Sequence, residues 1–231
     1  MQMAMVVCID FTASNGIQNQ PTSLHYVTPT KRSQYEEALH EVCNIVLDYD
    51  TDKLVPTFGF GAKVNLPNFA TGGKVHHCFP INGSEANPNL FQLAGIMQGY
   101  RNALPYLTFS GPTFFAPLLR EAMAVCENMK REVKEYMVLL ILTDGVIHDK
   151  EEVKDLLVKC GKLPLSIIII GIGKGDDWSA MHELDDDDCQ MTDFQGNKTQ
   201  RDLVQFVEFS QHNNNGVELA REVLEELPRQ V

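Results

Sequence analysis

The chain has 231 residues, with 19 basic and 31 acidic side chains, so its formal net charge is −12. This balance argues against nucleic-acid binding, because binding to a phosphate backbone depends on Lys and Arg displacing counterions. It also argues against unaided binding to anionic lipid. Apolar residues make up 44% of the chain and charged residues 22%, as in an ordinary globular protein. We therefore expect a globular protein that contacts neither nucleic acid nor membranes directly.

The cysteines and the apolar runs predict the cellular compartment. Six cysteines are spread along the chain without a CxxC pair, which excludes a zinc ribbon and a thioredoxin-type motif. The first residues carry no basic group ahead of an apolar stretch, so they do not resemble a signal peptide. The longest apolar runs, 136–142 and 165–172, are far shorter than the ~20 residues that span a bilayer. These features predict a cytoplasmic protein with reduced thiols.

Predicted strands and helices alternate along the chain. In chain order they are the strand Met5–Ile9, a helix that follows a capping box at Ser33 and Glu36, the strands Leu54–Phe60 and Lys74–Phe79, the helices Asn89–Leu104 and Phe114–Met129, the strand Met137–Leu142, the helix Lys150–Cys160, the strand Leu165–Ile170, the helix Asp176–Leu184, the strand Val204–Phe209 and the helix Gly216–Leu227. Apolar strands without polar alternation are typical of a parallel sheet that helices cover on both faces.

This order predicts one α/β domain over residues 1–231. We expect it to be doubly wound around a mostly parallel central sheet, with one antiparallel edge strand and helices on both faces. The polar run Lys74–Phe79 is the expected edge strand. In such sheets, ligands bind beyond the carboxyl ends of the strands, so the residues at those ends are the first candidates for a functional site.

Oxygen-bearing side chains gather at these strand ends. Asp10 closes the first strand, and Thr12 and Ser14 follow at alternate positions, which point to the same side of an extended chain. Thr113 lies in a loop before a helix, and Asp144 follows another strand. Any one aspartate here is also explained as a helix cap. Together, however, the five residues predict a site for Mg²⁺ or Mn²⁺, with Ca²⁺ less favoured.

The same five residues resemble the metal-ion-dependent adhesion site of von Willebrand factor A domains, and the surrounding sequence resembles the copine A domain. The segments that carry the second resemblance are Ile9–Gly16, Pro21–Tyr26, Phe58–Lys63, Gly111–Pro117, Leu163–Ile169 and Asp202–Val207. The resemblance runs from about Val6 to the C-terminus.

The resemblance implies a role for each site residue. The hydroxyls of Thr12 and Ser14 ligate the metal directly, and Thr113 does so directly or through water. Asp10 and Asp144 act through water or orient the hydroxyls. Because the direct ligands are mostly neutral, the ion keeps a positive field, and its open position binds an Asp or Glu of an intracellular partner protein. One departure from the usual pattern is Thr12, where serine is more common.

The resemblance also implies how such a module works in a longer protein. In copines, C2 domains that bind phospholipid under calcium control precede the A domain and link it to signalling, so we expect membrane association only through such domains. The predicted function is that of a metal-dependent protein-interaction module. An alternative is the copine-like A module of certain RING-type ubiquitin ligases, which would recruit substrates.

Three other patterns complete the prediction. A phosphoryl-transfer enzyme of the haloacid-dehalogenase kind needs a second aspartate two residues after the first, where this chain has Thr12, so we predict that the protein is not an enzyme. The acidic run Asp185–Asp188 predicts a solvated loop. The long connection Asn15–Arg32 lies beside the predicted metal and is expected to shape partner selectivity.

Overall fold

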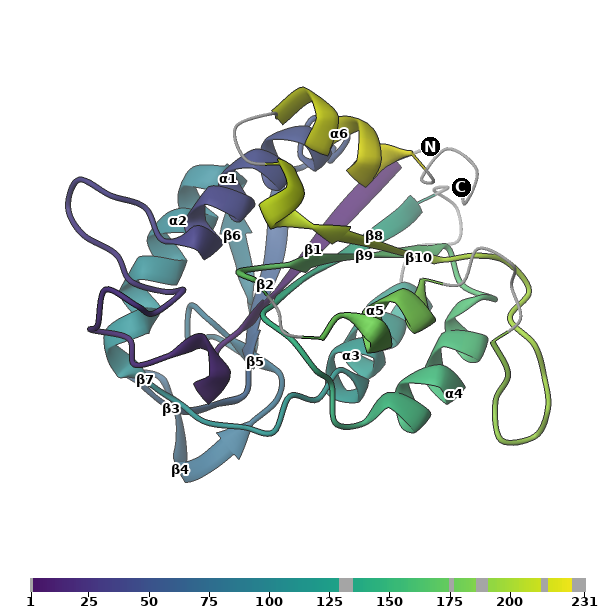
Figure 1. The fold of residues 1–231 in the computed structure, drawn as a ribbon, viewed down its shortest axis with the longest axis horizontal. Coiled ribbons are helices and arrows are strands. Elements are labelled where there is room, and N and C mark those ends of the chain that lie inside the picture. Colours follow the sequence, from purple (N-terminus) through teal and green to yellow (C-terminus); the bar gives the residue numbers. More distant parts are fainter. Residues whose placement is uncertain (1, 129–134, 175–176, 186–190, 213–215, 226–231) are drawn as a thin grey trace.

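The computed structural model describes residues 2–128, 135–174, 177–185, 191–212 and 216–225 and shows a central sheet between two layers of helices (Figure 1). The strands of this sheet are β1 (Gln2–Asp10), β2 (Leu54–Phe60), β5 (Phe79–Pro80), β6 (Asn89–Phe91), β8 (Glu135–Thr143), β9 (Leu165–Gly171) and β10 (Val204–Glu208). They lie in the order β10-β9-β8-β1-β2-β5, and β6 also pairs with β2.

The central sheet is mostly parallel, as predicted. The pairs β1–β2, β1–β8, β8–β9 and β9–β10 are parallel, whereas β5 and β6 pair with β2 in the antiparallel direction. Because parallel strands share one direction, β1 and β8 end at the same edge of the sheet, where Ile9 pairs with Leu142. This register brings Asp10 and Asp144 to neighbouring loops.

A second, smaller sheet corrects part of the prediction. It consists of β3 (Ala62–Leu66), β4 (Phe69–His76) and β7 (Leu107–Phe109), in the order β4-β3-β7. The predicted strand Lys74–Phe79 is divided: the residues up to His76 belong to β4, and Phe79 lies in β5 at the edge of the central sheet. The other two strands of the small sheet were not predicted.

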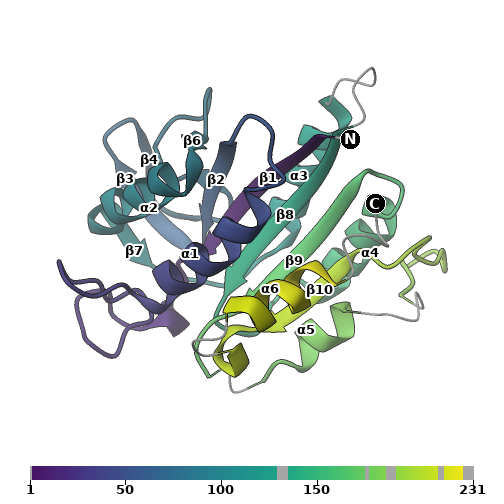
Figure 2. The same cartoon turned by 90° about the horizontal axis from the view of Figure 1, so that it is seen from above.

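Helices cover both faces of the central sheet, as predicted (Figure 2). One face carries α1 (Gln34–Val46), α2 (Gln92–Ala103) and α6 (Gly216–Leu224), and the other carries α3 (Ala116–Asn128), α4 (Lys150–Cys160) and α5 (Ser179–Leu184). Short 3₁₀ helices occupy Ala13–Asn15, Leu104–Tyr106 and Phe209–His212.

The largest differences from the predicted helix boundaries are at the starts of three helices. The predicted helix at Asn89 begins only at Gln92, because Asn89–Phe91 pair with β2. Phe114 and Phe115 precede α3, which begins at Ala116, and α5 begins only at Ser179. Among the strands, Phe209 begins a 3₁₀ helix instead of ending β10. Met129, Asp176 and residues 226–227, which were predicted as helix ends, lie outside the described residues, as do residues 186–188 of the acidic run.

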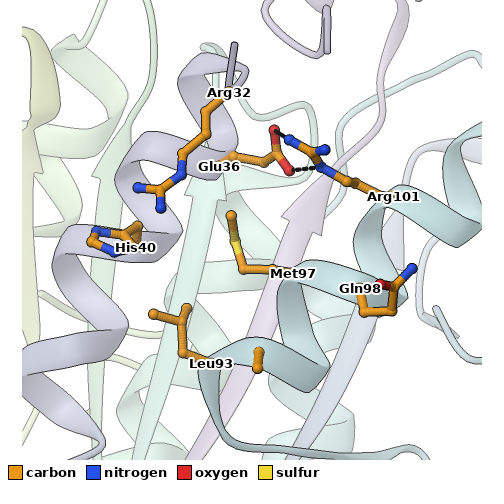
Figure 3. Close-up of a pocket in the computed structure, with 8 residues that line it drawn as sticks. Arg32, Glu36, His40, Leu93, Met97, Gln98 and Arg101 are labelled. Carbon is orange, nitrogen blue, oxygen red and sulfur yellow. Dashed lines mark hydrogen bonds and ion pairs between the residues drawn. The ribbon is translucent and has the colours of Figure 1, made fainter. Parts of the chain in front are cut away.

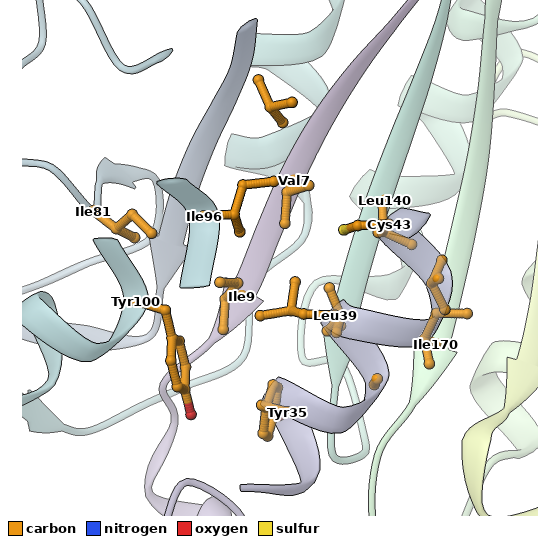
Figure 4. Close-up of a cluster of buried hydrophobic side chains, with 14 of the residues drawn as sticks. Val7, Ile9, Tyr35, Leu39, Cys43, Ile81, Ile96, Tyr100, Leu140 and Ile170 are labelled. Carbon is orange, nitrogen blue, oxygen red and sulfur yellow. The ribbon is translucent and has the colours of Figure 1, made fainter. Parts of the chain in front are cut away.

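The two apolar cores lie on opposite faces of the sheet because successive strand side chains alternate in direction. Val7 and Ile9 of β1 belong to the core under α1, α2 and α6, whereas Cys8 belongs to the core under α3, α4 and α5. Figure 4 shows the first core, in which Leu39 of α1 points toward Ile9. Such burial contributes about 1.5–3 kcal/mol for each large side chain, so these layers hold the strand ends in place.

The cysteines of the described segments are free thiols, and four of them are buried: Cys8, Cys43, Cys126 and Cys160. Burial raises the pKa of each of these thiols and keeps them in the neutral form. Within the same segments, no helix combines the length and the apolar character that a bilayer-crossing segment needs.

Candidate functional site at the ends of β1 and β8

Asp10 is completely buried at the end of β1, and both of its carboxylate oxygens accept hydrogen bonds. The backbone N–H of Thr12 donates to Oδ1 at 2.8 Å. The hydroxyl of Thr143, at the end of β8, donates to Oδ2 at 2.7 Å. Asp10 therefore ties the loop after β1 to the end of the neighbouring strand and has a fixed orientation.

Thr12, Ser14 and Asp144 form a continuous chain of hydrogen bonds. The Ser14 hydroxyl donates to Asp144 Oδ1 at 2.9 Å, and the Thr12 and Ser14 hydroxyl oxygens are 3.0 Å apart. Because Ser14 uses its proton on Asp144, Thr12 is the donor to Ser14. Four of the five predicted site residues are thus connected by direct hydrogen bonds, whereas their role as metal ligands stays a prediction.

Thr113 lies in a loop between the two aspartate-bearing loops, but its hydroxyl makes no hydrogen bond to the other four residues. Its backbone N–H donates to His148 Nδ1 at 3.2 Å, and its carbonyl accepts from His148 N at 2.9 Å. The start of this loop is held by Ser110, whose carbonyl accepts from Ala13 N at 2.5 Å. The structure therefore places Thr113 beside the site, whereas its role as a ligand stays a prediction.

Asp149 explains why the Thr113 loop ends where it does. Its carboxylate accepts hydrogen bonds from Phe115 N at 3.1 Å and Ala116 N at 2.8 Å, the first free N–H groups of α3. An acidic side chain here also favours the positive end of the helix dipole. The predicted start of the helix at Phe114 was two residues early because this cap comes from a distant loop.

Among the residues that the structure describes, the two aspartates of the site have no positively charged partner. Burial raises the pKa of Asp10, and burial together with the Asp10 charge raises the pKa of Asp144. No Lys, Arg or His in the described part of the chain forms an ion pair with either carboxylate. A divalent cation at this edge would offset the repulsion between them.

The geometry of the two hydroxyls fits such a cation. An octahedral ion with metal–oxygen bonds of about 2.0–2.1 Å holds adjacent ligand atoms about 2.8–3.0 Å apart, and Thr12 Oγ1 and Ser14 Oγ are separated by 3.0 Å. No group of three or more His, Cys, Asp or Glu side chains that could hold a metal ion occurs in the described segments, at this site or away from it. A metal site in this region therefore depends on the hydroxyl oxygens.

Asn15 is hydrogen-bonded to Thr12 and helps to hold it in place, a role that the sequence analysis did not predict. Its side chain is 1% exposed, and Nδ2 donates to the carbonyl of Thr12 at 3.2 Å and approaches Thr12 Oγ1 at 3.4 Å. The same residue begins the long connection Asn15–Arg32, which the structure anchors through Ser23: the Ser23 hydroxyl donates to the Asn15 carbonyl at 3.0 Å. This connection thus contributes directly to the shape of the site.

His25 is a second supporting residue that was not predicted, although it lies within Pro21–Tyr26, one of the segments that resemble the copine A domain. It is fully buried, with Nε2 2.8 Å from the Asp10 carbonyl and Nδ1 2.7 Å from the Tyr100 hydroxyl. Its ring stacks on Tyr35 with centroids 4.0 Å apart. Burial lowers the pKa of His25 to about 3, so the ring is neutral at physiological pH.

Comparisons with known proteins identify this arrangement of sheet, helices and loops as a von Willebrand A-type (VWA) domain. The SpRpn10 VWA domain superposes with a TM-score of 0.55 at 10% sequence identity, over 90% of this chain and 88% of that one. A manganese-loaded TRAP protein of Plasmodium vivax superposes with a TM-score of 0.51 at 14% identity, over 91% of this chain and 70% of that one. At such identities the likeness establishes the fold.

The family model for copines matches residues 23–231, so the chain belongs to the copine family. This confirms the resemblance that the sequence motifs indicated. The matched region includes Thr113 and Asp144 but begins after Asp10, Thr12 and Ser14. For these three residues the hydrogen-bonded geometry therefore carries the argument.

Proposed function

We propose that this copine-family VWA domain is a protein-interaction module that binds an acidic side chain of a partner protein through Mg²⁺ or Mn²⁺. The carrying observation is the pair of hydroxyls, Thr12 Oγ1 and Ser14 Oγ, at the spacing of adjacent octahedral ligands and beside two buried carboxylates. Thr12 and Ser14 would hold the ion directly, with Thr113 as a third ligand and with Asp10 and Asp144 orienting the hydroxyls or bound waters.

The predominance of neutral ligands decides what a bound ion can do here. An ion whose charge is not cancelled by direct carboxylate ligands attracts an external carboxylate to its open position. The partner that we propose is therefore an intracellular protein with an Asp or Glu side chain that can reach the open position of the ion. A separate observation disfavours phosphoryl transfer by Asp10: both of its carboxylate oxygens already accept hydrogen bonds, from Thr12 and Thr143. We accordingly propose a binding module and not an enzyme.

The proposal also covers the setting of the domain. We propose that it acts in the cytoplasm and in signalling. Any calcium-dependent attachment to phospholipid would come from C2 domains of a full-length copine. The net charge of −12 supports this division, because an acidic surface is repelled by anionic lipid. Nucleic acid is disfavoured as a partner on the same electrostatic ground.

Thermal unfolding with and without Mn²⁺ tests the metal site. At a free Mn²⁺ concentration about a hundred times its Kd, binding stabilises the folded state by about 2.7 kcal/mol. Ser14→Ala should abolish this stabilisation. Ser110→Ala is the matched control, because the Ser110 hydroxyl lies on the adjoining loop but donates to the Thr108 carbonyl at 3.1 Å. Equal stabilisation of the wild type and Ser14→Ala would contradict the proposed ligand set.

Partner capture tests the carboxylate receptor separately. A partner recovered with the Mn²⁺-loaded domain should be lost when a chelator is added and should not be recovered with Ser14→Ala. Replacing the acidic residue of the partner by its amide should have the same effect as the chelator. Binding that survives both changes would show that another surface of the domain carries the interaction.

A further inference from the structure

A groove of about 510 Å³ lies between α1 and α2 and shares no residue with the candidate metal site. The residues that line it are Arg32, Glu36, His40, Leu93, Ala94, Met97, Gln98 and Arg101. Figure 3 shows the guanidinium groups of Arg32 and Arg101 on opposite sides of Glu36, with Met97 and Leu93 below them in this view. The half-buried side chains of Leu93 and Met97 make one part of the lining apolar.

The charges in this groove leave one arginine without a partner. Arg101 Nε and Nη2 contact the two carboxylate oxygens of Glu36 at 2.5 and 3.1 Å. Glu36 is completely buried and also accepts from Ser33 N at 3.0 Å, so its charge is fully committed. Arg32 is exposed and has no ion pair or hydrogen bond with any described residue. The groove is therefore locally positive on a protein whose net charge is −12.

The two arginines differ in what they leave free for a ligand. Arg101 directs Nε and Nη2 at Glu36, and its remaining nitrogen Nη1 points away from that carboxylate. The guanidinium of Arg32 lies on the other side of Glu36 (Figure 3) and is uncommitted among the described residues. Guanidinium groups bind carboxylates through paired N–H donors, and such charge-assisted bonds are about twice as strong as neutral ones.

We propose that this groove binds an acidic segment of a partner protein. A carboxylate of the segment is held by the free guanidinium of Arg32, and a neighbouring apolar side chain packs against Leu93 and Met97. Methionine adapts its shape to different apolar side chains, so the apolar part of the groove accepts more than one residue type. Charge complementarity favours this groove as the binding place of an acidic segment, because the remaining protein surface is acidic and repels such a segment.

The test uses a short peptide of alternating Glu and Leu, with the full chain labelled with ¹³C at its methionine methyl groups and with a chelator present. The chelator separates this site from the proposed metal site, because no ion is then available to hold a carboxylate. We expect the Met97 methyl resonance to shift with the peptide to saturation, while the completely buried Met137 methyl stays unchanged. A control peptide in which Gln replaces every Glu (the Gln/Leu peptide) should bind at least about tenfold more weakly.

Two variants assign the effect to the arginine. Arg32→Gln should weaken binding of the Glu/Leu peptide at least about tenfold, whereas Lys31→Gln, which removes a neighbouring exposed charge outside the groove, should change it less than about twofold. The proposal is overturned by any of four results: no shift of Met97, equal shifts with the Gln/Leu peptide, equal affinity in Arg32→Gln, or the same Met97 shift with inorganic phosphate alone.

Discussion

The domain should lose stability in mild acid because its fold keeps His25 neutral, whereas the unfolded chain can protonate it. His25 is buried between Tyr35 and Phe11, with ring centroids 4.0 and 5.0 Å from theirs. Its Nε2–H donates to the Asp10 carbonyl, which can only accept, so the neutral ring uses Nδ1 as the acceptor for Tyr100. A protonated ring would make Tyr100 accept from Nδ1–H, which reverses the hydrogen bond between Tyr100 and Ser33, and would bring a charge into an apolar stack.

The sign of the effect follows from the two pKa values of His25. Burial lowers the folded-state pKa from the ordinary 6.5 to about 3. Above the ordinary pKa both states are neutral, and the histidine makes no difference. Below it the unfolded chain takes up a proton that the folded chain does not, so the free energy of unfolding falls by about 1.4 kcal/mol per pH unit until the pH reaches the folded-state value. Between about pH 7 and about pH 5 the loss is about 2 kcal/mol.

The assay is urea unfolding at several pH values in the presence of a chelator, with His25→Gln as the variant. Glutamine keeps a donor group but does not titrate, and the other ionisable groups contribute equally to both proteins. The wild type should therefore lose about 2 kcal/mol more than His25→Gln over this pH interval. Tyr100→Phe retains His25 and should retain the pH dependence. Parallel pH profiles for the wild type and His25→Gln would refute the reasoning.

Two further predictions concern the packing around the site and the groove. Gly61 has a φ of +78°, and a Cβ at this position would overlap the Cγ2 methyl of Thr12. Gly61→Ala should therefore lower the free energy of unfolding in urea by about 2–3 kcal/mol. Adding Thr12→Ser, which removes that methyl, should restore about 1 kcal/mol of this loss. Strict additivity of the two changes would contradict the overlap. Arg101→Gln should cost about 3 kcal/mol because it leaves the buried Glu36 without its cation, whereas Arg32→Gln should stay within about 0.5 kcal/mol; similar losses in the two variants would show that Glu36 does not depend on Arg101.

The parts of the fold that sequence reasoning predicted best are those with a purely local signal. The runs that became β1, β8 and β9 are continuous and apolar, which is the pattern of strands buried on both faces. The helix Lys150–Cys160 was predicted with the bounds that the structure has. The capping box at Ser33 is also present, with Ser33 Oγ accepting from Glu36 N at 3.2 Å.

The errors arose where pairing between distant segments decides the structure. Ala62–Leu66 alternates buried and exposed residues, which is a strand signal that was overlooked. Leu107–Phe109 is too short to be recognised, and it forms a strand only because it pairs with β3. Asn89–Phe91 fits a helical pattern locally but pairs with β2 instead. In each case the partner strand supplies information that the segment lacks.

The candidate site divides in the same way. That Asp10, Thr12, Ser14 and Asp144 lie together could be predicted because they follow the ends of two neighbouring parallel strands. The alternation expected for an extended chain does not describe Ser14, which lies in the 3₁₀ helix Ala13–Asn15. His25 could not be predicted, because its value to the site depends on Tyr100, which is 75 residues away in the sequence. A lone histidine in a long loop gives no indication that it will be buried beneath a neighbouring strand.

The hydrogen bonds around His25 connect the candidate metal site with the groove between α1 and α2. The Ser33 hydroxyl, 3.0 Å from the Tyr100 oxygen, is the donor in that pair because Tyr100 gives its own proton to His25. Ser33 in turn accepts from Glu36 N, and the Glu36 carboxylate binds Arg101 in the groove. As long as His25 is neutral, each hydrogen bond in this series has only one possible direction. The backbone that positions Asp10 and the carboxylate that positions Arg101 are therefore parts of one hydrogen-bonded network, and protonation of His25 would reverse the direction of its central bond from Ser33 to Tyr100.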